Sequence, residues 1–129
     1  LLRNKFLDSF SFGVLNCHMG VLPNYRGMDV VEWPFLENKN RQVGVTCHLM
    51  DKGIDTGDIL EIVKVDSDKF QNFIELREYL SGVMFKLMIK TISSIKKGSF
   101  KKQKQLPSDG KQYFVMHPTL RKITENKYK

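Results

Sequence analysis

Hydrophobic and polar residues alternate along two segments of the chain, as they do in strands that bury one face. From Gln42 to Met50, alternate apolar residues would line one face, while Thr46 and His48 would line the other. From Asp58 to Val65 the alternation is imperfect, which indicates a strand partly buried on both faces. An apolar run from Phe12 to Asn16 predicts a third, short and buried strand.

Two other segments have the three- and four-residue spacing of amphipathic helices. The longer one is predicted to start at Asp68, with Gln71 as the second half of a capping box, and to stop at Gly98. Its apolar stripe consists of Phe73, Leu76, Leu80, Leu87 and Ile95. The shorter one covers about residues 28–38, and Pro34 should kink or shorten it.

Strands and helices in this order predict an α/β fold with a mixed sheet and a long packing helix. A last short strand is expected over Gln112–Met116. The 129 residues, 41% of them hydrophobic, are enough for one domain with a modest core. No apolar run approaches the roughly 20 residues that span a bilayer, and no signal segment opens the sequence, so we expect no membrane association.

The formal net charge of +7 is concentrated late in the sequence, between Lys96 and Lys104 and after Arg121. A solvated helix end and tail explain this distribution, and a surface that attracts an anionic substrate is the alternative. A non-catalytic basic binding module is a rival interpretation for the whole chain. Such a module would bind nucleic acid with an affinity that falls steeply with salt.

The two cysteines, Cys17 and Cys47, form neither a CxxC motif nor a disulfide framework. They are typical of reduced thiols, which indicates a cytoplasmic protein. A nucleophilic pair of Cys17 and His18 is disfavoured, because adjacent residues of a strand point to opposite faces.

Asn16 and His18 stand two positions apart near the end of the first predicted strand, so their side chains leave the same face. An amide and an imidazole can both donate to an oxygen that becomes negative in an acyl-type reaction. A nearby carboxylate would fix the tautomer of His18, and Asp51, Asp55 and Asp58 are the candidates.

Two other interpretations of these residues stay open at this point. Asn16 and His18 can simply cap a turn, with Asp55 in an ordinary tight loop. His18, His48 and an aspartate can also bind a metal ion, although their separations match no compact zinc pattern.

Two linear motifs favour the catalytic interpretation of these residues. Asn-Cys-His at 16–18 with Leu-Pro-Asn-Tyr-Arg-Gly at 22–27 resembles the N-x-H and LPxYRG of folate-dependent formyltransferases. The segment from Gly44 to Leu60 is similar to the GVTxHxMDxGxDTGDIL of the same family. The resemblance covers residues 12–97 and implies the C-terminal half of a Rossmann-like formyltransferase domain.

The resemblance implies roles for individual residues, with Asn16, His18 and Asp55 as the catalytic residues and 10-formyltetrahydrofolate as the co-substrate. The segment expected to contact the folate consists of Met50, Asp51, Lys52, Gly53 and Ile54. The segment expected to shape the side of the acceptor amine consists of Tyr25, Arg26 and Gly27, and a structural role in the loop itself is the alternative for Tyr25 and Arg26. No metal is implied.

The sequence also departs from the family pattern. Relatives have an additional N-terminal portion that completes the folate pocket, so we expect weak folate binding and a homo-oligomer. We divide the chain into a catalytic segment, residues 1–98, and a basic connector and tail, residues 99–129. The sequences of residues 26–34 and 112–118 most resemble those of enzymes that formylate amino sugars on nucleotides. Enzymes of the same family that act on initiator tRNA usually carry a further C-terminal barrel domain. The methionyl-tRNA and glycinamide ribonucleotide enzymes are the alternatives.

Overall fold

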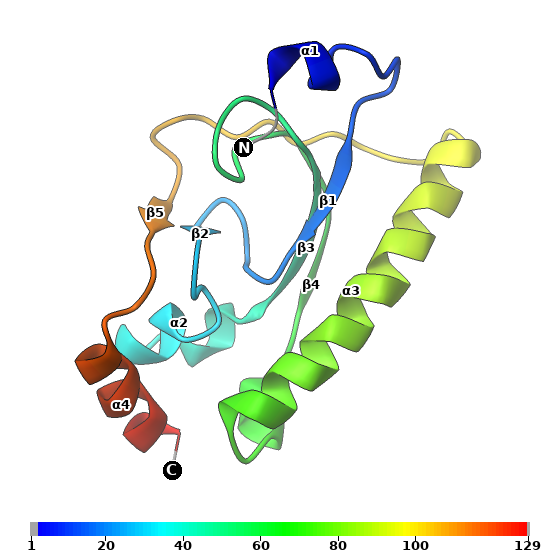
Figure 1. Cartoon of the computed structure of the whole chain (residues 1–129). Helices are drawn as coiled ribbons and strands as arrows, with labels where there is room; N and C mark the ends of the chain where they lie inside the picture. Colours follow the sequence, from blue (N-terminus) through cyan, green and yellow to red (C-terminus); the bar gives the residue numbers. More distant parts are fainter. Residues whose placement is uncertain (1–2, 129) are drawn as a thin grey trace.

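The central element of the structure, a computed structural model that describes residues 3–128, is an antiparallel three-stranded sheet (Figure 1). Across the sheet the strands follow the order β1 (Leu15–His18), β3 (Gly44–Leu49) and β4 (Ile59–Lys64). The long helix α3 (Phe73–Lys96) packs along one face (Figure 1). The expected α/β fold with a long packing helix is confirmed.

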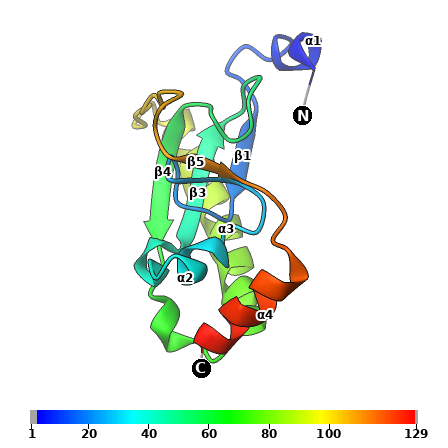
Figure 2. The ribbon, with the colours of Figure 1, turned by 90° about the vertical axis from the view of Figure 1, so that its left-hand side faces the viewer.

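A second, two-stranded sheet lies across the other face (Figure 2). It consists of β2 (Tyr25–Gly27) and β5 (Lys111–Tyr113), which pair in parallel. The antiparallel pairings therefore lie in the main sheet, and the parallel pairing lies in the second sheet. The remaining elements are α1 (Asn4–Leu7), α2 (Trp33–Leu36), η1 (Asn40–Gln42), η2 (Ser67–Lys69) and α4 (Pro118–Lys127).

Strand parity separates the core from the polar face of the main sheet. Cys17 pairs directly with Cys47, and both belong to the core cluster under α3, where Leu76 and Leu80 are fully buried. Because successive side chains alternate, the neighbours of these cysteines, such as His18, point to the face covered by β2 and β5. The faces predicted for β3 are those observed.

The start of α3 differs from the sequence-based expectation. Its N-cap is Asn72, whose side chain accepts from the Glu75 amide at 3.0 Å, while the Glu75 carboxylate accepts from the Gln71 amide at 3.0 Å. Asp68 instead lies in η2. The helix starts at Phe73, directly after its N-cap, and Phe73 is the first residue of the helix that is buried in the core.

Three other boundaries also differ. The first strand is Leu15–His18 rather than 12–16, because Gly13 has a φ of +116° and interrupts the extended chain. The short helix has only four residues, since Asp29 has a left-handed φ of +52° and Pro34 occupies the first turn. The strand expected over Gln112–Met116 is β5, Lys111–Tyr113, and the expected tail also contains α4, which packs against α2.

Among residues 3–128, none of the helices is both long and apolar enough to cross a membrane.

Candidate active site

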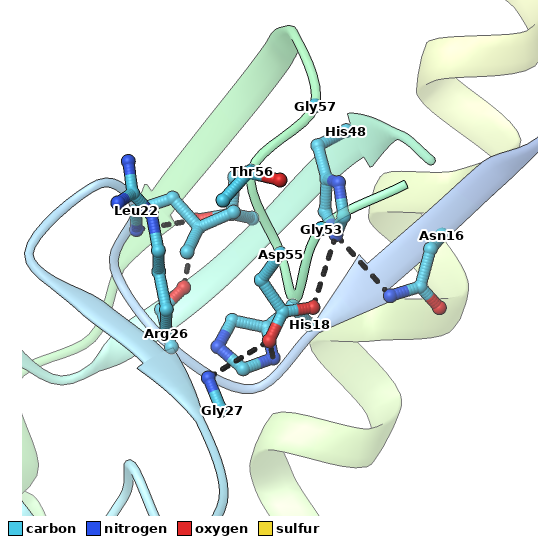
Figure 3. A network of polar contacts seen from close by, with 12 residues as sticks. Asn16, His18, Leu22, Arg26, Gly27, His48, Gly53, Asp55, Thr56 and Gly57 are labelled. Atoms are coloured by element: carbon cyan, nitrogen blue, oxygen red, sulfur yellow. Dashed lines mark hydrogen bonds and ion pairs between the residues drawn. The ribbon is translucent and has the colours of Figure 1, made fainter. Parts of the chain in front are cut away.

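Four polar side chains converge on the face opposite α3 (Figure 3). Asn16 and His18 come from β1, His48 comes from β3, and Asp55 comes from the loop between β3 and β4. The carboxylate of Asp55 lies between the two imidazoles, 3.5 Å from Nδ1 of His18 and 3.5 Å from Nε2 of His48. The structure thus brings Asn16, His18 and Asp55 together, as the strand parity predicts.

The turn after β1 is what holds the His18 ring. Nε2 of His18 lies 2.9 Å from the Tyr25 carbonyl oxygen, so the chain must fold back within seven residues. Gly20 permits this fold, because a Cβ at that position would lie 2.6 Å from His18 Nε2 and 2.8 Å from the Tyr25 oxygen. Thr46 secures the turn by donating to the Gly20 carbonyl at 2.7 Å.

A contact from β2 and the conformation of its own loop fix the position of Asp55. The Gly27 amide donates to its Oδ2 at 2.9 Å, which places the end of β2 against the carboxylate. Asp55 also has a left-handed φ of +54°, a conformation that costs a non-glycine residue about 1 kcal/mol or more. Within the loop, Asp51 accepts from the Gly53 amide at 2.9 Å and from the Thr56 hydroxyl at 2.6 Å.

A glutamine from the segment after α3 contacts the same loop. The Gln105 side-chain nitrogen donates to the carbonyls of Asp55, at 3.0 Å, and Gly57, at 2.6 Å. Its oxygen accepts from Nε and Nη2 of Arg26 at 3.2 and 3.0 Å. Arg26 is 5% exposed, so its guanidinium is enclosed beside the loop (Figure 3).

The hydrogen-bond partners assign the tautomers of both histidines. Nε2 of His18 faces the Tyr25 carbonyl and Nδ1 of His48 faces the Leu49 carbonyl at 2.8 Å, so each of these nitrogens must carry a proton. In neutral rings, the nitrogens that face Asp55 are therefore acceptors. One added proton on either ring turns a repulsive contact with the carboxylate into an attractive one.

The pKa values of His18 and Asp55 are both shifted from their ordinary values, for identifiable reasons. Burial lowers the pKa of His18, and the charge of Asp55 and the bond to Tyr25 oppose this without overcoming it. Burial would raise the pKa of Asp55, but the attraction of its carboxylate to His48 and His18 when either ring is protonated, together with the Gly27 amide, outweighs it and leaves that pKa below its usual value. At neutral pH, the resting site therefore holds an ionised Asp55 beside a neutral His18.

We expect the His18 imidazole to titrate with a midpoint below the ordinary value of 6.5, as followed by NMR of the ring protons. Asp55→Asn should lower the midpoint further, because it removes the charge that favours imidazolium. With a folded-state pKa below that of the unfolded chain, the unfolded chain binds more protons between the two values. Stability is therefore complete above about pH 6.5 and falls as the pH drops towards the folded-state pKa. A His18 midpoint above 6.5 would contradict this assignment.

The other expected site residues lie around this cluster in different ways. In the expected folate segment, Asp51, Lys52 and Gly53 are exposed, while Met50 and Ile54 are half-buried. Of the expected acceptor segment, only Gly27 contacts Asp55 directly; Arg26 contacts Gln105. The Tyr25 ring points away, because it stacks on Tyr113 at 5.1 Å and its hydroxyl donates to Glu37.

The structure also shows where the residues of the two alternative sites, the Cys17–His18 pair and the metal site, lie. Cys17 lies on the α3 side of the sheet, and a hydrogen bond with Cys47 raises the pKa of its thiol. His18, His48 and Asp55 do meet, but within residues 3–128 no group of three histidine, cysteine or carboxylate side chains is arranged to hold a metal ion.

Two contributors to the cluster were not assigned from the sequence. The sequence assigns His48 no catalytic role, although its parity on β3 places it on the polar face. Gln105 was placed in a connector, and nothing in its local sequence signals a contact with residues about 50 positions earlier.

Comparisons with known proteins identify the family. The family model described as formyl transferase matches residues 1–92. The methionyl-tRNA formyltransferase of Lachnospira eligens is 32% identical over 127 residues, which cover 98% of this chain and 40% of that protein. The chain therefore spans about two fifths of the length of this curated relative.

Solved structures give the same result. The formyltransferase PseJ from Anoxybacillus kamchatkensis, in complex with UDP-4,6-dideoxy-4-formamido-L-AltNAc and tetrahydrofolate, is 26% identical with a TM-score of 0.74, over 89% of this chain and 59% of that one. The N-formyltransferase from Helicobacter canadensis, in complex with folinic acid and dTDP-3-aminofucose, is 29% identical with a TM-score of 0.61, over 79% and 38%. With the family model covering most of its length and these folds superimposing on it, the chain belongs to the formyl transferase family.

Proposed function

We propose that this chain is the catalytic part of an enzyme that transfers a formyl group from 10-formyltetrahydrofolate to a primary amine. The observation that carries the proposal is the carboxylate of Asp55 between His18 and His48, with the amide of Asn16 beside them. Acyl transfer needs a donor for the oxyanion and an acceptor for the proton of the amine. This cluster offers both within one face of the sheet.

In the proposed reaction, the amine nitrogen attacks the formyl carbon and the carbonyl oxygen becomes an oxyanion. Asn16 Nδ2 uses one hydrogen for His48 Nε2 at 3.2 Å, and its second hydrogen is free to donate to the oxyanion. The proton of the amine moves to Nδ1 of His18, and Asp55 stabilises the imidazolium. The bond between the formyl carbon and folate N10 then breaks, and N10 takes the proton held at Nδ1 of His18, which leaves the formamide and tetrahydrofolate.

The segment from Met50 to Ile54 is proposed to bind the folate. Its exposed residues 51–53 immediately precede Asp55, so a bound formyl group would lie close to the cluster. Two structural relatives are complexes with tetrahydrofolate and folinic acid, which supports a folate co-substrate here.

For the acceptor, we propose an amino sugar linked to a nucleotide. The relatives of known structure named above are bound to a UDP-linked and a dTDP-linked sugar, and the net positive charge of this chain suits an anionic acceptor. Methionyl-tRNA is the second candidate, favoured by the curated relatives, and glycinamide ribonucleotide is the third.

Self-association of the protein also stays a prediction. The exposed apolar side chains of Ile74, Phe85 and Ile89 on α3 favour it.

The proposal is tested by incubating the complete protein with 10-formyltetrahydrofolate and each acceptor in turn, with release of tetrahydrofolate and formamide mass as readouts. We expect turnover with a nucleotide-linked amino sugar and little with methionyl-tRNA. Turnover with methionyl-tRNA alone would transfer the assignment to the second candidate. No turnover with any amine, together with salt-sensitive nucleic-acid binding that does not need Asn16 and His18, would favour the basic binding module.

A further inference from the structure

Arg26 and Gln105 form a hydrogen-bonded pair, with Arg26 buried and Gln105 half-buried, that takes no part in the proposed chemical steps. Arg26 is 5% exposed, and Nε and Nη2 of its guanidinium donate to neutral oxygens: the side chain of Gln105 at 3.2 and 3.0 Å, and the Leu106 carbonyl at 3.2 Å. Enclosing a cation among neutral partners is unfavourable unless it is well hydrogen-bonded. This arrangement therefore points to a role other than simple packing.

The guanidinium determines which way the Gln105 amide faces. Because Arg26 only donates, the glutamine must present its oxygen to Arg26, and its nitrogen then faces the loop between β3 and β4. From there Nε2 donates to the Asp55 and Gly57 carbonyls at 3.0 and 2.6 Å. Both hydrogens of the amide nitrogen are used, one on each side of Thr56.

This contact acts on the residue with the most demanding backbone in the site. Asp55 has a φ of +54°, and the direction of its side chain, towards both histidines, depends on that conformation. Gln105 itself is anchored nearby, because the Gln103 backbone pairs with Ile59 through two hydrogen bonds of 2.8 Å. The segment after α3 is thus fixed to β4 and reaches the loop from a defined position.

We propose that Gln105, oriented by Arg26, is a positioning residue that holds the backbone of Asp55 in the conformation needed for its carboxylate to lie between His18 and His48. The inference rests on the proposed function insofar as it concerns formyl transfer. Of the two roles that the sequence left open for Arg26, the acceptor side and a structural role, it assigns a structural one, the support of the catalytic loop. Residues 103–106 then belong to the active site although they lie beyond the matched family model.

The test compares Gln105→Ala with Gln103→Ala in the complete protein. Gln103 is a matched control, because it is the same residue type two positions away, with an exposed side chain and only backbone contacts to β4. For Gln105→Ala we expect kcat to fall by up to about 100-fold with little change in the KM of the acceptor, since misplacing a catalytic group by about 1 Å costs that much. Gln103→Ala should retain the wild-type values.

A second readout does not depend on turnover. In Gln105→Ala, the His18 midpoint observed by NMR should fall, because a displaced Asp55 no longer favours the imidazolium, and the amides of residues 55–57 should exchange faster. Gln105→Glu should behave like Gln105→Ala, since a carboxylate keeps the contact with Arg26 but cannot donate to the two carbonyls.

The outcomes separate this inference from the proposed function. A lower melting temperature with unchanged kcat and His18 midpoint would mean that Gln105 only stabilises the fold, and wild-type behaviour of Gln105→Glu would also overturn the inference. If the wild-type protein transfers no formyl group, the proposed function fails, and the His18 titration and amide exchange still decide whether Gln105 positions Asp55.

Discussion

Asp55→Asn should lower kcat for formyl transfer by about 10²- to 10⁴-fold, the range for loss of acid–base catalysis. The asparagine keeps the volume of the carboxylate but cannot stabilise an imidazolium at His18, 3.5 Å away. The Gly27 amide can still donate to the side-chain oxygen, so the loop should stay folded. Steady-state kinetics with 10-formyltetrahydrofolate, together with a thermal melt, measure both effects.

Asp58→Asn is the matched control for this substitution. Asp58 lies three residues further along the same loop, and the sequence alone left it as a candidate beside Asp55. Its backbone carbonyl accepts from the Leu49 amide, a contact that the substitution leaves in place. We expect nearly wild-type turnover for Asp58→Asn. Equal losses in the two variants would remove Asp55 from its assigned role.

Glu32→Ala should destabilise the fold by roughly 2–4 kcal/mol, a large effect for one carboxylate. Glu32 is 1% exposed and accepts from Arg77 of α3, with contacts of 2.6 to 2.9 Å, and from Arg121 of α4 at 3.1 Å. Its removal leaves a void beside two guanidinium groups, which keep Asp29 as a partner, 2.7 Å from Arg121 and 3.9 Å from Arg77. Both are also about one-third exposed and can recover some water. In a thermal melt, the midpoint should fall by roughly 6–15 °C.

Glu61→Ala provides the comparison for this prediction. Glu61 and Lys90 form an ion pair of 3.0 Å in which the side chains are 37% and 62% exposed. Exposed pairs contribute about 0–1 kcal/mol, so the melting temperature should change little. If both variants melted alike, the buried network would not be what joins α3 and α4 to the segment before α2.

The parts of the site that the sequence predicted depend on short-range geometry. The two-residue period of a strand is sufficient to place Asn16 and His18 on one face, and the same rule puts His48 there from β3. Asp55 required the resemblance to a family motif, because residue types alone left three aspartates equivalent. The contacts at Asp55 distinguish it from the others.

The boundaries of α3 show where local patterns stop being decisive. Asp68 and Asn72 both belong to residue types that cap helices, and each is followed three residues later by a plausible partner, Gln71 or Glu75. The difference lies in tertiary packing, since Phe73 meets Phe35 and Tyr128 in the core, at ring distances of 4.8 Å. Tertiary contacts of this kind cannot be predicted from the ten or so residues around the start of the helix.

The contributions from residues 99–128 were the least predictable. Gln105 meets Arg26 across 79 positions of sequence, and Lys111–Tyr113 pair with a strand that ends at Gly27. A short strand was predicted over Gln112–Met116, but its bounds and its pairing with β2 were not, because three residues are too few to show a period. The basic connector before it shows no pattern at all. Long-range contacts alone determine how these residues lie.

The same long-range pairing sets an order for assembly during protein synthesis. β1, β3, β4 and α3 are complete once residue 96 has left the ribosome, and they can form the main sheet and its helix at that stage. Gln105 and β5, which secure the loop of Asp55 and the strand that carries Gly27, are synthesised later. The nascent chain can therefore form its main sheet and α3 before the geometry around Asp55 is complete.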